Sequence, residues 1–330
     1  MSGRRRPRLA VVTAVVAAGL VVGLAGCGGS TDTAAPAGGT ATTTAAPSTT
    51  ATGRVNPESI KAADIVADDY RTFDMCSLAD YPALSIKGSA TPGWSDSYGQ
   101  CVVFIDATAP VEVTIGPFVA AGQGAVPGFT GLAGGVTDVV THVDFGGCEH
   151  DLVFVDQVQL RIGAYPTDDT KPIAACDILR QVADSVITAA ANGKGKPYTN
   201  LHPKSFRGLD ACAAAPAGVF TVTGVAEGPA NHRCKWSTPD DTVTVTFADG
   251  FGATFDTENG AIAADIAGRA SLVQEYSDEY GICVVSTYHL PAAAGYQEQA
   301  AVRVVGPDKK PNCAEARRVA EAVWPTLPTL

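Results

Sequence analysis

The chain has 330 residues, of which 46% are hydrophobic and 17% are charged, and its formal net charge at pH 7 is −11. This length exceeds that of one typical domain, and the apolar fraction is sufficient for folded cores. The acidic balance argues against a nucleic-acid partner and against polybasic docking on anionic lipid.

A secretory signal opens the chain. Four arginines, at positions 4, 5, 6 and 8, precede an apolar segment over residues 9–24. The segment is shorter than the ~20 residues of a spanning helix, so residues 1–27 are predicted to be a signal peptide rather than a membrane anchor. The pair Arg5-Arg6 leaves open a twin-arginine export route, in which folding precedes export.

The stretch Leu24-Ala25-Gly26-Cys27 ends this segment and resembles a bacterial lipobox. The resemblance implies cleavage before Cys27 and attachment of lipid such as palmitate to this cysteine, which would hold the protein on the outer face of the cell membrane. Cleavage would remove four arginines and leave 19 basic and 34 acidic residues, a net charge of −15. Residues 28–55 consist mostly of Thr, Ala, Pro, Gly and Ser, a composition typical of a disordered tether.

Eight further cysteines reveal an internal repeat. The gaps between them are 25, 47 and 28 residues in the first set of four and 22, 49 and 30 residues in the second. They are Cys76, Cys101, Cys148, Cys176, Cys212, Cys234, Cys283 and Cys313. We therefore predict two copies of one domain, over residues 56–197 and 198–330.

In an oxidising compartment, four cysteines per copy indicate two disulfides, and spacing alone allows three pairings. We favour first with second and third with fourth, because the third cysteine lies in a strand-like run and the fourth at the start of a helix. A metal site is the alternative, but no Cys-x-x-Cys motif is present.

Helices are predicted over residues 57–73 with Asn56 as N-cap, over 173–190, over the Ala-rich stretch 260–270, and after Asn312. Strands are predicted over 111–115, 149–155, 158–162, 242–247, 282–289 and 300–305. The two final helices share their register, with apolar residues six and ten positions after the fourth cysteine of each copy. The fold class is therefore α+β, with each copy an antiparallel sheet covered by helices.

Six features of the chain are a lipobox, a Thr/Ala/Pro tether, an Asp-x-Cys start (Asp210-Ala211-Cys212), a Cys-x-Trp motif (Cys234-Lys235-Trp236), a cysteine-bearing strand and a closing helix with its own cysteine. Together they resemble the DUF3558 family of actinobacterial lipoproteins. The first copy departs from the motif, because Val103 stands in the place of the tryptophan. The resemblance implies an envelope location and a sheet-and-helix fold. It implies neither an activity nor catalytic residues.

Chemistry-bearing motifs are few. The histidines are His142, His150, His202, His232 and His289. A cluster over residues 142–150 lacks a recognised metal-ligand spacing, so His142 and His150 are predicted to be surface or turn residues. No Gly-x-Ser-x-Gly elbow of a serine hydrolase occurs. The glycine-rich stretch 122–135 has no phosphate-binding order and is predicted to be a loop, with a lid over a groove as the alternative.

Trp94, Tyr98 and Trp236 lie near the second cysteine of their copies and are predicted to pack over the disulfides; a solvent-facing glycan or peptide site is the alternative. We expect a membrane-tethered binding or interaction protein, with an envelope protein, a cell-wall component or a small ligand as partner. No enzymatic activity, cofactor or metal is expected. The rival hypothesis is a cell-envelope hydrolase, which a deep pocket holding Ser or Asp/Glu against a histidine would favour. A rigid spacer without a pocket is the third.

Overall fold

The structure is a computed structural model, and it describes residues 59–66, 69–85, 88–93, 98–106, 110–120, 130–131, 135–143, 146–167, 175–193, 195–276, 281–292, 295–306 and 311–329. The predicted signal, Cys27, the tether and Asn56 lie outside these ranges. Within the described part, no helix is both long enough and apolar enough to span a bilayer.

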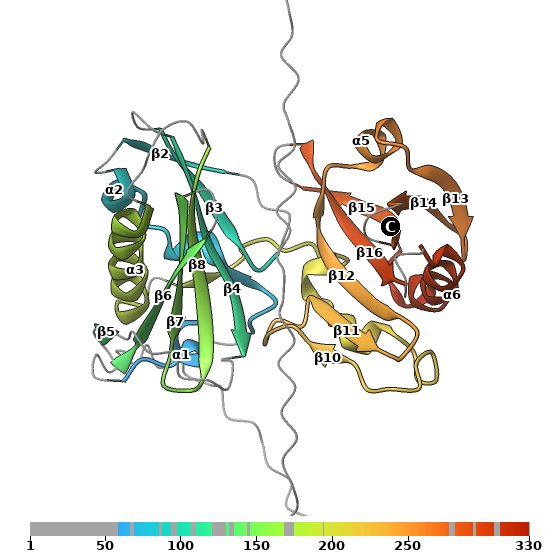
Figure 1. The fold of residues 1–330 in the computed structure, drawn as a ribbon, viewed down its shortest axis with the longest axis horizontal. Helices are drawn as coiled ribbons and strands as arrows, with labels where there is room; N and C mark the ends of the chain where they lie inside the picture. The colour runs from blue at the N-terminus through green and yellow to red at the C-terminus, as the bar shows by residue number, and fades with distance from the viewer. Residues whose placement is uncertain are drawn as a thin grey trace, which may run out of the picture. The chain divides into compact units, whose positions relative to one another are not determined.

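The first large sheet has seven strands in the order β2-β3-β4-β8-β7-β6-β5 (Figure 1). All of its neighbouring strands are antiparallel. The strands are β2 (Ser89–Pro92), β3 (Cys101–Asp106), β4 (Val111–Ala120), β5 (Thr130–Gly131), β6 (Thr137–Val143), β7 (Gly147–Val153) and β8 (Val158–Pro166).

The second large sheet also has seven antiparallel strands, in the order β10-β11-β12-β16-β15-β14-β13. They are β10 (Val225–Ala226), β11 (Arg233–Ser237), β12 (Thr242–Gly250), β13 (Ile262–Ile266), β14 (Arg269–Tyr276), β15 (Ile282–Pro291) and β16 (Gln297–Val305). In both sheets, three consecutive strands run inward from one edge and the other four follow in reverse order. All six strands predicted from the sequence are present.

Alternating burial explains why these segments form strands. In β16, Glu298, Ala300, Val302 and Val304 are buried and the residues between them are partly exposed, so one face of the strand meets the core. Side chains of successive strand residues point to opposite faces, which is the origin of this period of two. A charged residue at one of the buried positions, Glu298, is the exception that marks the site described below.

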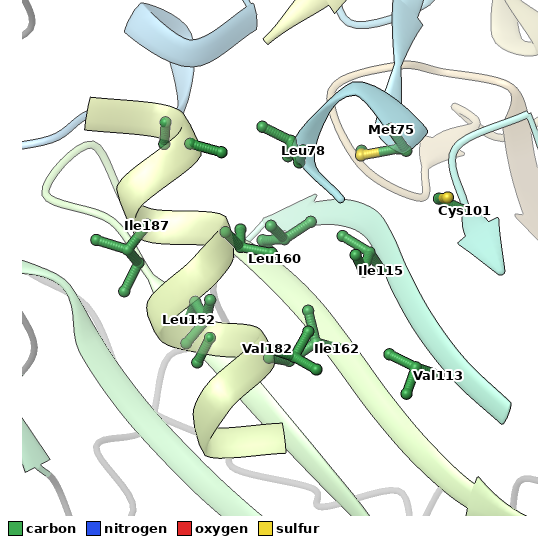
Figure 2. Packing of buried hydrophobic residues seen from close by; sticks show 14 of the residues in the cluster. Met75, Leu78, Cys101, Val113, Ile115, Leu152, Leu160, Ile162, Val182 and Ile187 are labelled. Carbon is green, nitrogen blue, oxygen red and sulfur yellow. The ribbon is translucent and has the colours of Figure 1, made fainter. Parts of the chain in front are cut away.

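One long helix packs on each large sheet. The first, α3 (Ala175–Ala191), contacts β7 and β8, and α6 (Cys313–Val323) contacts β15 and β16. Figure 2 shows Val182 of α3 close to Ile162 of β8, within the first hydrophobic core. The predicted N-cap of α6 is confirmed, because the Asn312 side chain accepts a hydrogen bond from the Glu315 amide at 3.1 Å.

The remaining elements are short. A two-stranded sheet pairs β1 (Phe73–Asp74) with β9 (Lys196–Pro197). The helices are α1 (Ala62–Val66), η1 (Met75–Leu78), α2 (Tyr81–Leu84), η5 (Phe206–Gly208), α4 (Ala211–Ala214), α5 (Ala253–Glu258) and η8 (Trp324–Thr326).

Two helix predictions were wrong. The helix predicted over 57–73 is shorter, since α1 has five residues and Phe73 belongs to strand β1. The Ala-rich stretch 260–270 forms the hairpin of β13 and β14 instead of a helix. Ala267 and Gly268 form its turn with φ values of 53° and 77°, a left-handed pair that a helix does not accommodate. Pairing with the sheet therefore outweighs the helix propensity of alanine.

The predicted disulfide pairing is confirmed. Cys76 bonds Cys101 and Cys148 bonds Cys176 in the first half of the described chain. In the second half, the pairs are Cys212–Cys234 and Cys283–Cys313. The second disulfide of each half joins an interior strand, β7 or β15, to the first turn of the long helix, and so fastens the helix to its sheet.

Candidate functional site

A cavity of about 300 Å³ lies at one end of the second sheet. One part of its wall comes from residues 198–202, Ser205 and Arg207, which lead into and include part of η5. The other part comes from residues 290–292 and Glu298, at the end of β15 and the start of β16. The lining residues are Tyr198, Thr199, Asn200, Leu201, His202, Ser205, Arg207, Leu290, Pro291, Ala292 and Glu298. Apolar side chains and hydrogen-bonding groups are mixed in this wall, as is usual for small-molecule sites.

Glu298 is the buried acid of the cavity wall, with an exposed fraction of 5%. The Ser205 hydroxyl donates a hydrogen bond to one of its carboxylate oxygens, and the Phe206 amide donates to the other at 2.9 Å. Ser205 is also the N-cap of η5, because its hydroxyl accepts from the Arg207 amide at 3.1 Å. These hydrogen bonds fix the start of η5 to the Glu298 carboxylate, which also lines the cavity.

A second acid, Asp249, lies directly opposite Glu298 in the register of β12 and β16. Two like charges at such a position repel each other. The Arg207 guanidinium relieves the repulsion, because it donates a hydrogen bond to Asp249 within an ion pair whose side chains are 16% and 13% exposed. A buried ion pair of this kind depends on geometry and further contacts to offset the cost of desolvation.

Two aromatic rings hold Arg207 in place. Its guanidinium carbon lies 4.3 Å from the ring centroid of Tyr98 and 4.6 Å from that of Tyr198. Tyr98 comes from the first half of the chain, yet it is buried in the core of the second half, and both residues belong to one compact unit. Stacking on two rings favours arginine over lysine at this position, since the planar guanidinium can lie over both faces.

Three buried polar atoms around Arg207 have no hydrogen-bond partner among the described residues. They are the Tyr98 hydroxyl, Oδ1 of Asp249 and Nδ1 of His232. Such orphaned groups are costly and rare in folded proteins, so each of them calls for an explanation.

Burial also displaces the pKa values of this cluster. It raises the pKa of the Asp249 carboxyl to about 6, although the Arg207 charge opposes this rise. Burial lowers the pKa of the His232 imidazole to about 4, so the ring is neutral at pH 7. It also raises the pKa of the Tyr98 phenol, with the Glu298 and Asp249 charges adding to the rise.

The contacts of Ser205 are unlike those of a serine nucleophile. Its hydroxyl contacts Glu298 and the Arg207 amide. His202 lies in the same wall, but its Nδ1 accepts a hydrogen bond from the Lys204 amide at 3.2 Å, and His289 binds the Lys204 carbonyl at 2.9 Å. A nucleophilic serine is activated by a base that accepts its proton, usually a histidine. The described contacts of Ser205 do not include such a base.

His150 differs from its predicted role as a surface or turn residue. It is 1% exposed in β7, and its Nδ1 lies 3.0 Å from the carboxylate of Asp138, which is 2% exposed. Nε2 of His150 has no hydrogen-bond partner in the described part of the chain. The side chain of His142, together with Asp144, lies outside what the structure describes. No group of three or more His, Cys, Asp or Glu side chains in the described ranges has a metal-binding arrangement.

The aromatic residues near the disulfides have different surroundings. Trp236 is 4% exposed, stacks on Phe220 with centroids 4.3 Å apart, and lies beside Gly224 and Cys234, as the packing prediction requires. Tyr98 instead packs against Arg207 and His232. Trp94 and most of the glycine-rich stretch 122–135 lie outside the described residues.

Arg207, Asp249 and Glu298 were not among the residues singled out from the sequence. A signal for the two acids does exist, since Asp249 has the same strand parity as buried Val243, Val245 and Phe247. Glu298 likewise has the parity of Ala300, Val302 and Val304. An acid on the core-facing parity of a strand needs a buried partner, and this marks both positions.

Comparisons with known proteins add little to this site. Neither a family model nor a curated protein matches the chain. Among solved structures, the chain is similar to the di-domain ARO/CYC StfQ from the steffimycin biosynthetic pathway, at 13% identity over 80% of this chain and 90% of that chain, with a TM-score of 0.18. A likeness at that score carries no argument about the fold or the function.

Proposed function

We propose that this protein is a non-catalytic binding protein of the cell envelope, held on the outer face of the membrane by lipid on Cys27. The lipobox sequence supports this location, and the four disulfides fit an oxidising compartment. The resemblance to the DUF3558 family agrees with the same location.

We infer further that the two large sheets belong to two copies of one domain, each covered by a long helix. The equal strand orders and the equal positions of the disulfides support this inference. In this scheme, the tether lifts a pair of related domains off the membrane, and one of them carries the site.

The observation that carries the binding function is the preformed cavity with Glu298 in its wall. Its charged groups are already positioned without a ligand, because Ser205 and Phe206 fix the carboxylate and Tyr98, Tyr198 and Asp249 fix the guanidinium. Preorganisation of this kind reduces the entropy lost on binding.

A cell-envelope hydrolase is the second candidate, and one observation favours it. Asp249 and Glu298 face each other across two strands, and the pKa of Asp249 is raised to about 6. Pairs of carboxyls with unlike environments perform acid–base catalysis in several enzyme classes. Against it, Asp249 is engaged by Arg207 and does not line the cavity.

Native mass spectrometry of the full chain, produced with its signal in an actinobacterial host and extracted in mild detergent, tests the binding function. We expect a bound small molecule on the intact protein, and its loss in Thr199→Trp, which places an indole on the cavity rim. The matched control is Thr221→Trp, an equally exposed threonine outside the cavity wall, which retains the ligand.

Three results would overturn the proposal. The first is absence of any bound molecule. The second is equal retention in both variants. The third is conversion of the captured molecule into a cleaved product by the purified protein, which would favour the hydrolase.

A further inference from the structure

The negative charge of Glu298, the acid in the cavity wall, is not balanced by a cation of its own. Arg207 forms its ion pair with Asp249, whereas Glu298 receives hydrogen bonds from two neutral donors, the Ser205 hydroxyl and the Phe206 amide. The two facing carboxylates, Asp249 and Glu298, thus share one guanidinium, that of Arg207. His232 does not add a positive charge, because its pKa lies near 4.

Glu298 keeps room for another donor. An ionised carboxylate has about four lone-pair sites, two on each oxygen. The protein donors described above occupy one site on each oxygen, so one site on each remains for a ligand. Charge-assisted hydrogen bonds from a cation are roughly twice as strong as neutral ones. Because Glu298 is only 5% exposed, water would screen such a bond less than at the surface.

The rest of the wall fits the body of a small organic molecule. Leu201, Leu290 and Pro291 offer apolar surface, and the exposed side chains of Thr199 and Asn200 offer hydrogen-bonding groups. A volume of about 300 Å³ is at the small end of ligand pockets.

We propose that this cavity binds a small molecule bearing a primary ammonium group, and that the Glu298 carboxylate receives the ammonium. The inference rests on the binding function proposed above and adds the chemical class of the ligand. An anion is disfavoured because Glu298 would repel it and because the Arg207 guanidinium, which also lines the wall, is already paired with Asp249. A purely apolar ligand would leave the buried charge uncompensated.

Three probes of equal carbon skeleton test the charge preference on the unmodified full chain in detergent micelles at pH 7. They are n-butylammonium, n-butanol and butyrate, titrated by saturation-transfer NMR. We expect n-butylammonium to bind about tenfold more tightly than n-butanol, as a charge-assisted hydrogen bond implies, and butyrate to bind least. Equal binding of the cation and the alcohol, or tighter binding of butyrate, would overturn the proposal without any variant being needed.

A matched pair of variants then assigns the preference to one residue. Glu298→Gln keeps the shape and acceptor oxygen of the side chain and should bring the two affinities within about twofold of each other. Glu227→Gln removes the same charge from an exposed side chain of the same half, which pairs with Arg233, and should keep the preference. Equal effects of the two variants would show that only the overall charge matters, and the site assignment would fail.

The outcome is separable from that of the proposed function. A co-purified ligand that is neutral or anionic, with no cation preference among the probes, refutes the ammonium proposal and leaves the binding function intact. Absence of a co-purified ligand together with no binding of any probe refutes both.

Discussion

The two seven-stranded sheets share a strand order and a disulfide scheme but place their buried polar groups differently. In the first sheet, His150 and Asp138 are buried under the helix-covered face. His150 lies two residues after Cys148, and Asp138 lies ten residues before it. Counting from the corresponding Cys283, Val285 takes the place of His150. Strand pairing likewise matches Asp138, opposite Leu152, with Ser271, opposite Thr287.

The second sheet has a polar contact of another kind at this place, since Ser271 accepts a hydrogen bond from Nε1 of Trp324 at 3.0 Å. Two residues farther toward the same strand ends, the relation is reversed. Asp249 faces Glu298 in the second sheet, whereas the corresponding pair of the first sheet is Ala120 opposite Val158.

One scaffold therefore supports two different interiors. The position that would carry an acid pair in the first sheet is occupied by uncharged residues, so the features that define the cavity belong to the second sheet. The difference teaches that the strand order and disulfides determine the framework, while a few side chains at strand ends determine the site.

The disulfides should give the largest and most equal effects. Replacing Cys148 and Cys176 by alanine opens a sequence separation of 28 residues, and replacing Cys283 and Cys313 opens one of 30. In the chain-entropy model each loss costs about 3–4 kcal/mol. Urea denaturation should show nearly equal losses, with Trp236 and Trp324 fluorescence reporting the second sheet. A loss twice as large in one sheet would break the structural equivalence.

The His150–Asp138 pair gives the next effect. Asp138→Leu leaves a buried imidazole without its partner and should lower the free energy of unfolding by about 3 kcal/mol. Adding His150→Leu removes the orphaned group, so the double variant should recover to within about 1 kcal/mol of the unmodified protein. Chemical denaturation measures both. A double variant as unstable as the single one would show that packing, and not pairing, is the main contribution.

Much of this framework is predictable from the sequence, because covalent and periodic features are local or repeated. Similar cysteine gaps indicated the repeat, and a strand-like run at the third cysteine with a helix start at the fourth gave the correct pairing. The shared register of the last helices placed Val182 and Val319 in their cores. The strands predicted over 149–155 and 158–162 are confirmed as β7 and β8, which pair with each other.

The site is not predictable in the same way, because its residues meet only through tertiary structure. Asp249 and Glu298 become neighbours through the pairing of β12 with β16, which are separated by three intervening strands in the chain. Tyr98 reaches the core of the other half. The error over 260–270 has a related origin, since sheet pairing decides between a strand and a helix for an Ala-rich segment.

Opposing titrations should distinguish the acidic end of the second sheet from its uncharged counterpart. The folded-state pKa of Asp249 is about 6, above its value in the unfolded chain, so this group lowers stability as the pH rises from about 4 to 6. The folded-state pKa of His232 is about 4, below its unfolded value, so this group adds stability as the pH rises from about 4 to 6.5. The two slopes nearly cancel in the unmodified protein.

Each single variant should reveal the slope of the other group. Asp249→Asn should lose about 2–3 kcal/mol of stability as the pH falls from 6.5 to 4, and His232→Gln should gain a similar amount as the pH falls from 6 to 4. Urea midpoints at intervals of half a pH unit measure this. Parallel curves for all three proteins would refute the assigned pKa shifts.

The smallest effect concerns the final helices, which differ in length: α3 has 17 residues and α6 has 11. A shorter helix depends more on its terminal hydrogen bonds. The Asn312 side chain accepts from the Glu315 amide at 3.1 Å and donates to Asp241 at 3.0 Å. Asn312→Ala should therefore cost about 1 kcal/mol.

Asn312→Ser is the matched control, because a serine hydroxyl caps the helix but is too short to reproduce the amide contact with Asp241. It should retain at least half of the stability that alanine loses, as measured by urea denaturation followed through Trp324, which adjoins the end of α6. Equal losses for serine and alanine would mean that Asn312 acts through Asp241 rather than as a cap. The contribution of α6 would then come from its disulfide and its buried face.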